Sequence, residues 1–179
     1  MNTLNKTVLA SILLASLTAF NAHAEEPVAQ QEKKFSIGLG TYSLILDHDS
    51  SGTKDDKFYG AALNAGYAFT DNFAIKGAYY YMEHDDFSDL EVEGIDLAVV
   101  AGTGLATEGF KIYGGVGLFS EKWKVKGLSG NEKFSGAQLV GGLGYNWEVV
   151  SLDFSVGIRD SSDYEDFAKK LGSNSDITA

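Results

Sequence analysis

Seven segments of the chain alternate apolar with polar or small residues at a period of two, and this pattern constrains the fold more than any other feature. Successive side chains of a β-strand point to opposite faces, so a period of two indicates strands with one apolar face. A convincing helical period of 3.6 residues is absent from every window. We therefore predict an all-β domain. The segments cover 35–46, 58–70, 73–83, 93–106, 110–120, 134–147 and 149–159.

The connections between these segments alternate in length. Minimal turns at 70–72, at 107–109 and around Glu148 alternate with long, polar and mostly acidic stretches. Short turns at one end and long loops at the other are typical of an antiparallel up-and-down barrel that crosses the bacterial outer membrane. We expect eight strands in such a barrel, although only seven are clearly visible. The long stretches cover 47–57, 84–92, 121–133 and 160–172.

Periodicity alone does not decide whether the apolar face points to lipid or into a water-free core. Three features favour lipid. Glycines gather on the less apolar face, where small residues would suit a narrow lumen. The segments are long enough to cross the hydrocarbon layer when tilted. Aromatic residues concentrate at the segment ends, which would place their rings at headgroup depth on both sides of a bilayer.

These aromatic residues form two predicted belts. One group lies beside the short turns, and the other lies toward the long loops. We expect the girdle to include Phe69, Phe73, Phe110, Tyr145 and Trp147 at the first end, and Tyr79 and Tyr81 at the second. The same argument adds Phe35 and Tyr67 to the first belt, and Tyr59, Tyr80, Phe119 and Phe134 to the second.

The N-terminal segment, residues 1–24, has the pattern of a secretory signal peptide. A short apolar core at 8–20 follows one lysine and ends at a small-x-small site, and it is too short for a membrane-spanning helix. Residues 25–34 are expected to be a flexible leader, and 35–179 the barrel. A net charge of −11 argues against nucleic acid as a partner, and the absence of cysteine excludes disulfides and thiolate metal sites.

Five charged residues fall on the face assigned to the lumen. Opposite charges inside a narrow barrel can pair, which lowers the cost of burying them. They would form either a structural network of salt bridges or an ion pathway. We favour the network, because about eight strands enclose no continuous channel. The residues are Lys76, Asp96, Lys111, Asp153 and Arg159.

The third long loop is basic and aromatic on an otherwise acidic protein. It holds Lys122, Trp123, Lys124, Lys126 and Lys133. This patch could bind lipid phosphates, an anionic glycan or a host protein. It could equally be an extension of two strands above the membrane, because its lysines alternate with other residues at a period of two.

The string GYAFTDNFAI at 66–75 has an aromatic-ended strand, a Thr-Asp-Asn turn and an apolar return. With this hairpin, nearly all of 35–159 resembles the small eight-stranded outer-membrane β-barrels typified by the OmpA transmembrane domain, OmpX, Ail and the opacity-like surface proteins. The resemblance implies an integral outer-membrane protein without an open pore. It also implies contact with outer-membrane lipid and lipopolysaccharide, and a role in adhesion, host interaction or envelope integrity.

The C-terminal segment departs from this family. Members usually end on a strand with a terminal aromatic residue, whereas this chain ends SNSDITA at 173–179. We therefore expect most of the eighth strand to be absent from this sequence, or limited to a stub at 177–179. Either case predicts a weakened seam beside the first and seventh strands, because backbone groups left unpaired in lipid are costly.

Two alternatives involve chemistry in the outer loops. His48 with Ser50 or Ser51 has the residue types of a base and nucleophile, as in the lipid A deacylase and palmitoyltransferase barrels, but a solvated acidic loop is the preferred interpretation. The many loop carboxylates could attract Ca²⁺ or Mg²⁺, yet no spacing matches a defined cation-binding loop. We predict no metal and no cofactor.

These observations predict a non-enzymatic outer-membrane barrel that presents its loops for surface interaction or envelope support. The alternatives are a narrow channel, a lipid-A-modifying enzyme and a soluble periplasmic barrel that binds a small apolar ligand. The last alternative would require the apolar faces to point inward.

Overall fold

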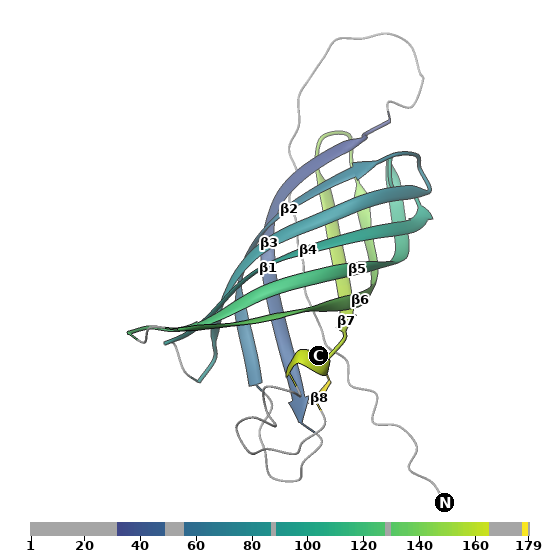
Figure 1. Cartoon of the computed structure of the whole chain (residues 1–179). Coiled ribbons are helices and arrows are strands. Elements are labelled where there is room, and N and C mark those ends of the chain that lie inside the picture. The colour runs from purple at the N-terminus through teal and green to yellow at the C-terminus, as the bar shows by residue number, and fades with distance from the viewer. Residues whose placement is uncertain (1–31, 49–55, 87–88, 128–129, 165–176, 179) are drawn as a thin grey trace, which may run out of the picture.

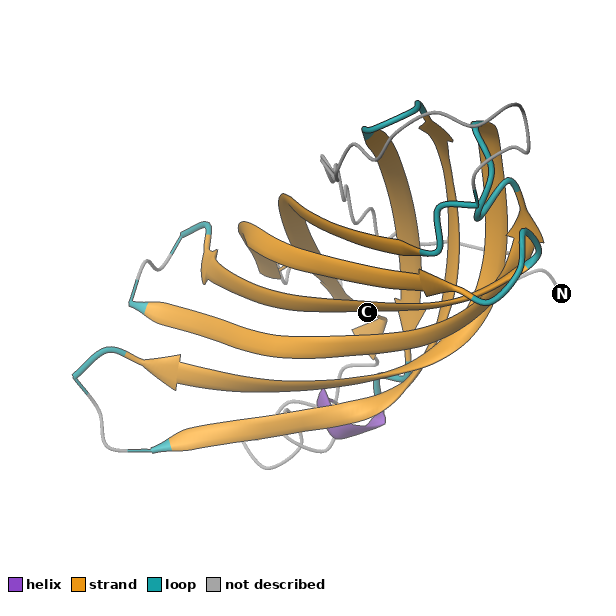
Figure 2. Ribbon diagram, turned by 90° about the horizontal axis from the view of Figure 1, so that it is seen from above, coloured by secondary structure: helices purple, strands orange, loops and turns teal. Residues whose placement is uncertain are grey.

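The computed structural model describes residues 32–48, 56–86, 89–127, 130–164 and 177–178. These residues form one antiparallel sheet with the strand order β7-β6-β5-β4-β3-β2-β1-β8. The sheet curls into a half-barrel (Figures 1 and 2). The predicted all-β, up-and-down architecture is confirmed. The strands are β1 (Phe35–His48), β2 (Asp56–Ala68), β3 (Phe73–His84), β4 (Leu90–Thr103), β5 (Gly109–Val125), β6 (Asn131–Asn146), β7 (Ser151–Arg159) and β8 (Ile177–Thr178).

The longest strands are β5 and β6, with 17 and 16 residues. Their ladder continues to the pair Lys124–Asn131, so most of the expected loop at 121–133 is strand. Of the two interpretations of the basic patch, the strand extension is the one that the structure shows. Hydrogen bonding across the ladder explains this, because the alternation of residues 121–125 matches that of the strand below.

The eighth strand is a stub. Ile177 and Thr178 pair antiparallel with His48 and Asp47 at the long-loop end of β1. Within the described ranges, β7 forms a ladder with β6 and with no other strand. The stub interpretation is therefore the one observed, and backbone pairing does not join β7 to β1 among the described residues.

Large apolar side chains on all seven long strands point away from the concave face. Leu39 and Leu118 are 69% and 65% exposed, and similar residues lie on every neighbouring strand. A soluble barrel would bury this face, so the ligand-binding alternative with inward apolar residues is wrong. In the described part of the chain, no helix is long and apolar enough to cross a membrane.

The aromatic side chains divide between the two faces. The seven girdle residues predicted first are all exposed, from 39% at Tyr81 to 59% at Phe110. The belt prediction is wrong for Tyr80, Phe119 and Phe134, which are at most 3% exposed. Their positions in the period of two place these rings on the concave face, where they pack against one another and against the interior charges.

Candidate functional site

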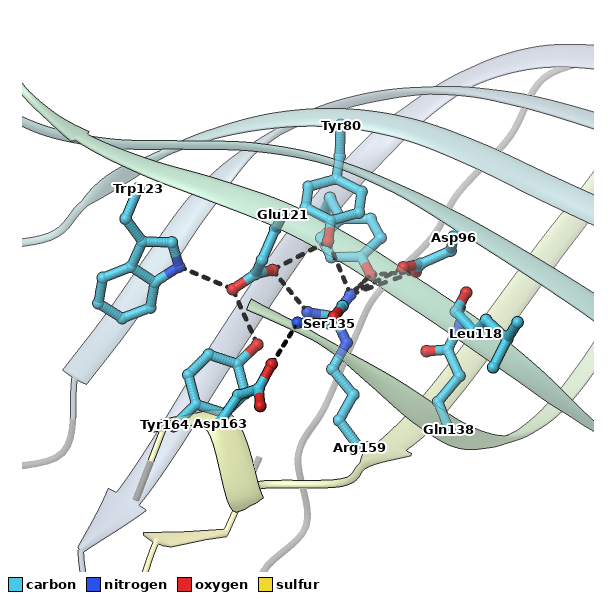
Figure 3. Close-up of polar contacts among 11 residues, drawn as sticks. Tyr80, Asp96, Leu118, Glu121, Trp123, Ser135, Gln138, Arg159, Asp163 and Tyr164 are labelled. Atoms are coloured by element: carbon cyan, nitrogen blue, oxygen red, sulfur yellow. Dashed lines mark hydrogen bonds and ion pairs between the residues drawn. The ribbon is translucent and has the colours of Figure 1, made fainter. Parts of the chain in front are cut away.

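Arg159 connects several strands in the long-loop half of the interior (Figure 3). Arg159 Nη1 donates to Glu121 Oε2 at 2.8 Å, and Nη2 lies 3.0 Å from Asp96 Oδ1. Nη2 also donates to the hydroxyl oxygens of Tyr42 at 2.6 Å and Tyr80 at 3.1 Å. Arg159 at the end of β7 thus contacts β1, β3, β4 and β5. Its side chain joins β7 to β1, where the described backbone forms no ladder.

Glu121 is the centre of a second set of contacts above this arginine. Its carboxylate accepts hydrogen bonds from the Tyr80 hydroxyl at 2.9 Å, Trp123 Nε1 at 2.7 Å and the Tyr164 hydroxyl at 2.8 Å. Tyr164 lies in a helical turn after β7 and stacks on Phe134, with ring centroids 4.8 Å apart. The long-loop end of the concave face is therefore filled with aromatic rings around a satisfied buried charge.

The sequence interpretation missed Glu121, because residues 121–133 were expected to be loop. Glu121 is buried, with only 1% of the residue exposed. The signal was available in the alternation, since Phe119, Glu121 and Trp123 continue the inward face of β5. Trp123 was expected to belong to the surface patch. That expectation is wrong, because the same alternation turns its indole toward Glu121.

A second charged layer lies nearer the short turns. Asp153 Oδ2 is 2.7 Å from Lys76 Nζ and 2.7 Å from Lys111 Nζ. The Tyr113 hydroxyl donates to the other carboxylate oxygen, and Lys76 Nζ donates to the Tyr113 hydroxyl oxygen at 2.7 Å. Lys111 Nζ also donates to Ser151 Oγ at 2.7 Å. The structure thus places all five predicted lumen residues on the concave face, three in this layer and two in the Arg159 layer.

A cavity of about 90 Å³ lies on the concave face and is lined by members of both layers, including Asp96 and Asp153. Asn64 also lines it, and the amide oxygen and nitrogen of Asn64 are buried without a hydrogen-bond partner among the described residues. A second cavity, of about 100 Å³, lies at the short-turn end. Each has room for a few water molecules, which occupy about 30 Å³ apiece in the liquid.

Two of the short turns, β2–β3 and β4–β5, are linked by one carboxylate. Asp71, from the β2–β3 turn, accepts hydrogen bonds from the backbone N–H groups of Gly104 at 3.0 Å and Ala106 at 3.1 Å. It also accepts from the N–H and hydroxyl of Thr107, at 3.1 and 2.8 Å. Partial burial acts to raise the pKa of Asp71, but these hydrogen bonds outweigh it and hold the pKa below its ordinary value.

The outward face carries a charged belt above the apolar band. Lys124 Nζ is 2.7 Å from Glu93, and Lys126 Nζ is 3.0 Å from Glu91 and 3.3 Å from Glu83. Lys122 and Lys133 are the remaining lysines of the predicted patch. They are exposed and directly opposite each other in the β5–β6 ladder. We call Glu83, Glu91, Glu93, Lys122, Lys124, Lys126 and Lys133 the outer belt.

The histidines do not form a described catalytic site. Ser50 and Ser51, and the side chain of His48, lie outside the described residues. His84 is buried at the end of β3, where its Nε2 lies 3.2 Å from Asp56 Oδ1 and its ring packs edge-on against Phe58. The described ranges also contain no group of three or more His, Cys, Asp or Glu residues that could hold a metal ion.

Comparisons with known proteins place this geometry in a family. Residues 10–178 match the model of the outer membrane protein beta-barrel domain. The chain is similar to the crystal structure of Ail, the attachment invasion locus protein of Yersinia pestis, with 20% identity over 72% of this chain and 97% of that chain and a TM-score of 0.42. A second Ail crystal structure, in complex with the heparin analogue sucrose octasulfate, gives 16% identity, 81% and 97% coverage and a TM-score of 0.34. No curated protein matches the chain. The matched range includes every described strand, and the chain belongs to the outer membrane protein β-barrel domain family.

Proposed function

We propose that this protein is a surface-anchored barrel without an open pore, and that its long-loop end contacts other surfaces or supports the envelope. The observation that carries the proposal is the filled interior. Two layers of ion pairs and an aromatic cluster occupy the concave face of the described strands, and two cavities beside them measure about 90 and 100 Å³. A body packed in this way supports a structural or binding role in preference to transport.

The β5–β6 hairpin is the element best placed for such contact. Both strands continue beyond the apolar band, and in Figure 1 the green hairpin reaches past its neighbours on the side of the long loops. Its outward face belongs to the outer belt, and its inward face is held by Trp123 and Phe134, whose ring centroids lie 5.0 Å apart. The hairpin therefore extends beyond its neighbours with a packed inward face, and a partner could bind to it.

Cell attachment tests the proposed function. We would display the protein on a bacterial strain lacking it and replace residues 126–130 by a two-residue turn. We expect this variant to fractionate with the outer membrane, to keep its heat-dependent mobility on SDS gels, and to attach less to host cells and to anionic glycan surfaces. A matched change in the short turn at 147–150 should leave attachment unaltered. Equal attachment of all three strains would contradict a binding role for the hairpin.

The enzyme and channel alternatives have direct tests. Replacing His48 by Ala should leave the mass spectrum of lipid A unchanged if the protein is not a lipid-A-modifying enzyme. The wild-type protein in planar bilayers should show no steady conductance, since the concave face is occupied by the two charged layers. Modified lipid A or stable conductance would replace the proposed function.

A further inference from the structure

A lysine, an asparagine and an aspartate meet on the concave face near the short turns. Lys111 of β5 is opposite Gly144 of β6, which is opposite Asp153 of β7. Asn146 lies two positions after Gly144, on the same inward face. Lys111 Nζ is 3.1 Å from Asn146 Oδ1 and 2.7 Å from Asp153 Oδ2, and all three residues are at most 7% exposed. An amine, a carboxamide and a carboxylate are thus in contact away from bulk water.

The amide of Asn146 is oriented at both of its ends. Its Nδ2 donates to the backbone oxygens of Gly104 at 2.8 Å and Thr107 at 2.9 Å. Its Oδ1 accepts from Lys111 Nζ and from the Ser151 hydroxyl, which lies at 2.7 Å. These four contacts fix which end of the amide is oxygen and which is nitrogen. Hydrogen bonds to Oδ1 also stabilise negative charge on this oxygen, and they make the carbonyl carbon Cγ more electrophilic.

The space around Lys111 suits a reaction with this amide. The lysine stem crosses Gly144, where an added Cβ would lie 2.6 Å from Lys111 Cε. A side chain at this position would displace the end of the lysine. Lys111, Asn146, Ser151 and Asp153 also line the cavity of about 100 Å³ at the short-turn end. This cavity has room for a released molecule the size of water, which occupies about 30 Å³ in the liquid.

We propose that Lys111 and Asn146 form an isopeptide cross-link, an amide bond between their side chains that joins β5 to β6. Lys111 passes a proton to the Asp153 carboxylate, and the charge that remains then resides on Lys76, whose side chain is 32% exposed. The neutral Lys111 amine is a nucleophile. Its flexible stem lets it move from the amide oxygen to the face of Cγ, and the contacts already made replace a bimolecular encounter.

The reaction balances without an oxidant or a cofactor. A bond forms between Lys111 Nζ and Asn146 Cγ, and the bond between Cγ and Nδ2 breaks. The Ser151 hydroxyl stabilises the negative charge that develops on Oδ1. Asp153 returns its proton to the departing nitrogen and accepts the extra proton of the attacking one. A lysine ammonium and a carboxamide are thereby converted into a secondary amide and an ammonium ion.

The cross-link would lie at the end of the β5–β6 hairpin away from its projecting tip. It would close the chain between positions 111 and 146 into a covalent ring, which restricts the unfolded state as a disulfide does. The sequence contains no cysteine, so this bond would stabilise the hairpin through a different chemistry. The inference goes beyond the proposed function, because the bond would form whether or not the hairpin binds a partner.

Peptide mass spectrometry of the full-length protein, purified from outer membranes, tests the proposal. The protein is denatured and digested, and the peptides that contain Lys111 and Asn146 are sequenced. Lys111→Arg removes the nucleophile and keeps the positive charge, and Asp153→Asn removes the proton acceptor. Lys76→Arg is the matched control, because it changes the other cation on Asp153 and leaves the reacting pair intact. Heat-dependent mobility on SDS gels verifies the fold of each variant.

We expect the wild type and Lys76→Arg to yield one branched peptide, lighter by one ammonia than the two separate peptides together. Lys111→Arg should yield none, and Asp153→Asn should form the bond about a hundredfold more slowly. Separate peptides from folded wild-type protein, with an intact amide at Asn146, would overturn the proposal without any variant. A branched peptide at Asn146 that persists in Lys111→Arg would assign the bond to another lysine and overturn it too.

Discussion

The two charged layers of the interior are each centred on a residue of β7, but the central charge is positive in one layer and negative in the other. In the layer near the long loops, the cation of Arg159 lies among the carboxylates of Asp96 and Glu121. In the layer near the short turns, the carboxylate of Asp153 lies between the ammonium groups of Lys76 and Lys111. Each layer thus attaches the edge strand β7 to strands across the concave face.

The layers differ in the exposure of their charged side chains and in the strands that these side chains contact. The side chains of Arg159 and Glu121 are both 0% exposed, whereas that of Lys76 is 32% exposed. Arg159 also contacts Tyr42 on β1, across the seam, whereas Asp153 contacts side chains of β3 and β5. We infer that the long-loop layer stabilises the seam between β7 and β1 more than the short-turn layer does.

Replacing Arg159 by Met should have the largest effect. The change leaves Asp96 and Glu121 buried without their cation, which we expect to lower the free energy of unfolding by about 3–5 kcal/mol. Urea unfolding in detergent micelles would measure it. Arg159→Lys should lose less, since it keeps the charge but not the forked geometry. A stable Arg159→Met protein would show that the long-loop layer is not a brace.

Replacing Asp153 by Asn should have a smaller effect, of about 2–3 kcal/mol in the same assay. Lys76 is partly exposed and can turn toward water. Only Lys111 then stays buried without a carboxylate partner. Adding Lys111→Met should recover part of the loss. A cost above that of Arg159→Met would reverse the comparison between the layers.

Replacing Gly94 by Ala tests the space beside the long-loop layer, and replacing Gly142 by Ala tests the space beside the other. An added Cβ would lie 2.5 Å from the Tyr80 hydroxyl in the first case and 2.3 Å from the Tyr113 ring in the second. We expect each to lower stability by about 1–3 kcal/mol through overpacking. Gly114→Ala is the matched control, because its nearest contact is at 3.8 Å. Equal stability of all three variants would mean that the rings shift freely.

Replacing Asp71 by Asn should have the smallest effect, about 1 kcal/mol at neutral pH, because water screens the exposed part of this carboxylate. The folded protein holds the pKa of Asp71 below its ordinary value of 3.8. Its contribution is therefore full above pH 3.8 and is lost as the pH falls through the lower folded value. Unfolding measured from pH 6 to pH 2 should show this loss in the wild type and not in Asp71→Asn.

The interior shows how far sequence reasoning reached. Alternation alone placed Lys76, Asp96, Lys111, Asp153 and Arg159 on one face, and all five lie on the concave face of the sheet. The same rule would have placed Glu121 and Tyr80 there. Both were assigned elsewhere, because proximity to an expected long loop was given more weight than the period of two.

The outer belt shows a different limit. The sequence distinguished neither a loop from a strand at 121–133 nor a paired lysine from an unpaired one. That distinction depends on the ladders, which place Lys122 directly opposite both Glu93 and Lys133, and on the diagonal contact of Lys124 with Glu93. Contacts between neighbouring strands follow from register, and register depends on turn geometry and on the pairing of whole strands.

The sequence by itself determined the strands, the face of most residues and the end at which each connection lies, because these follow from local alternation and turn composition. Only the tertiary structure decided which charges meet. Arg159 and Tyr42 are 117 positions apart and hydrogen-bond because the sheet curls enough to bring β7 near β1. That curvature comes from the twist and packing of all the strands together, and no single segment encodes it.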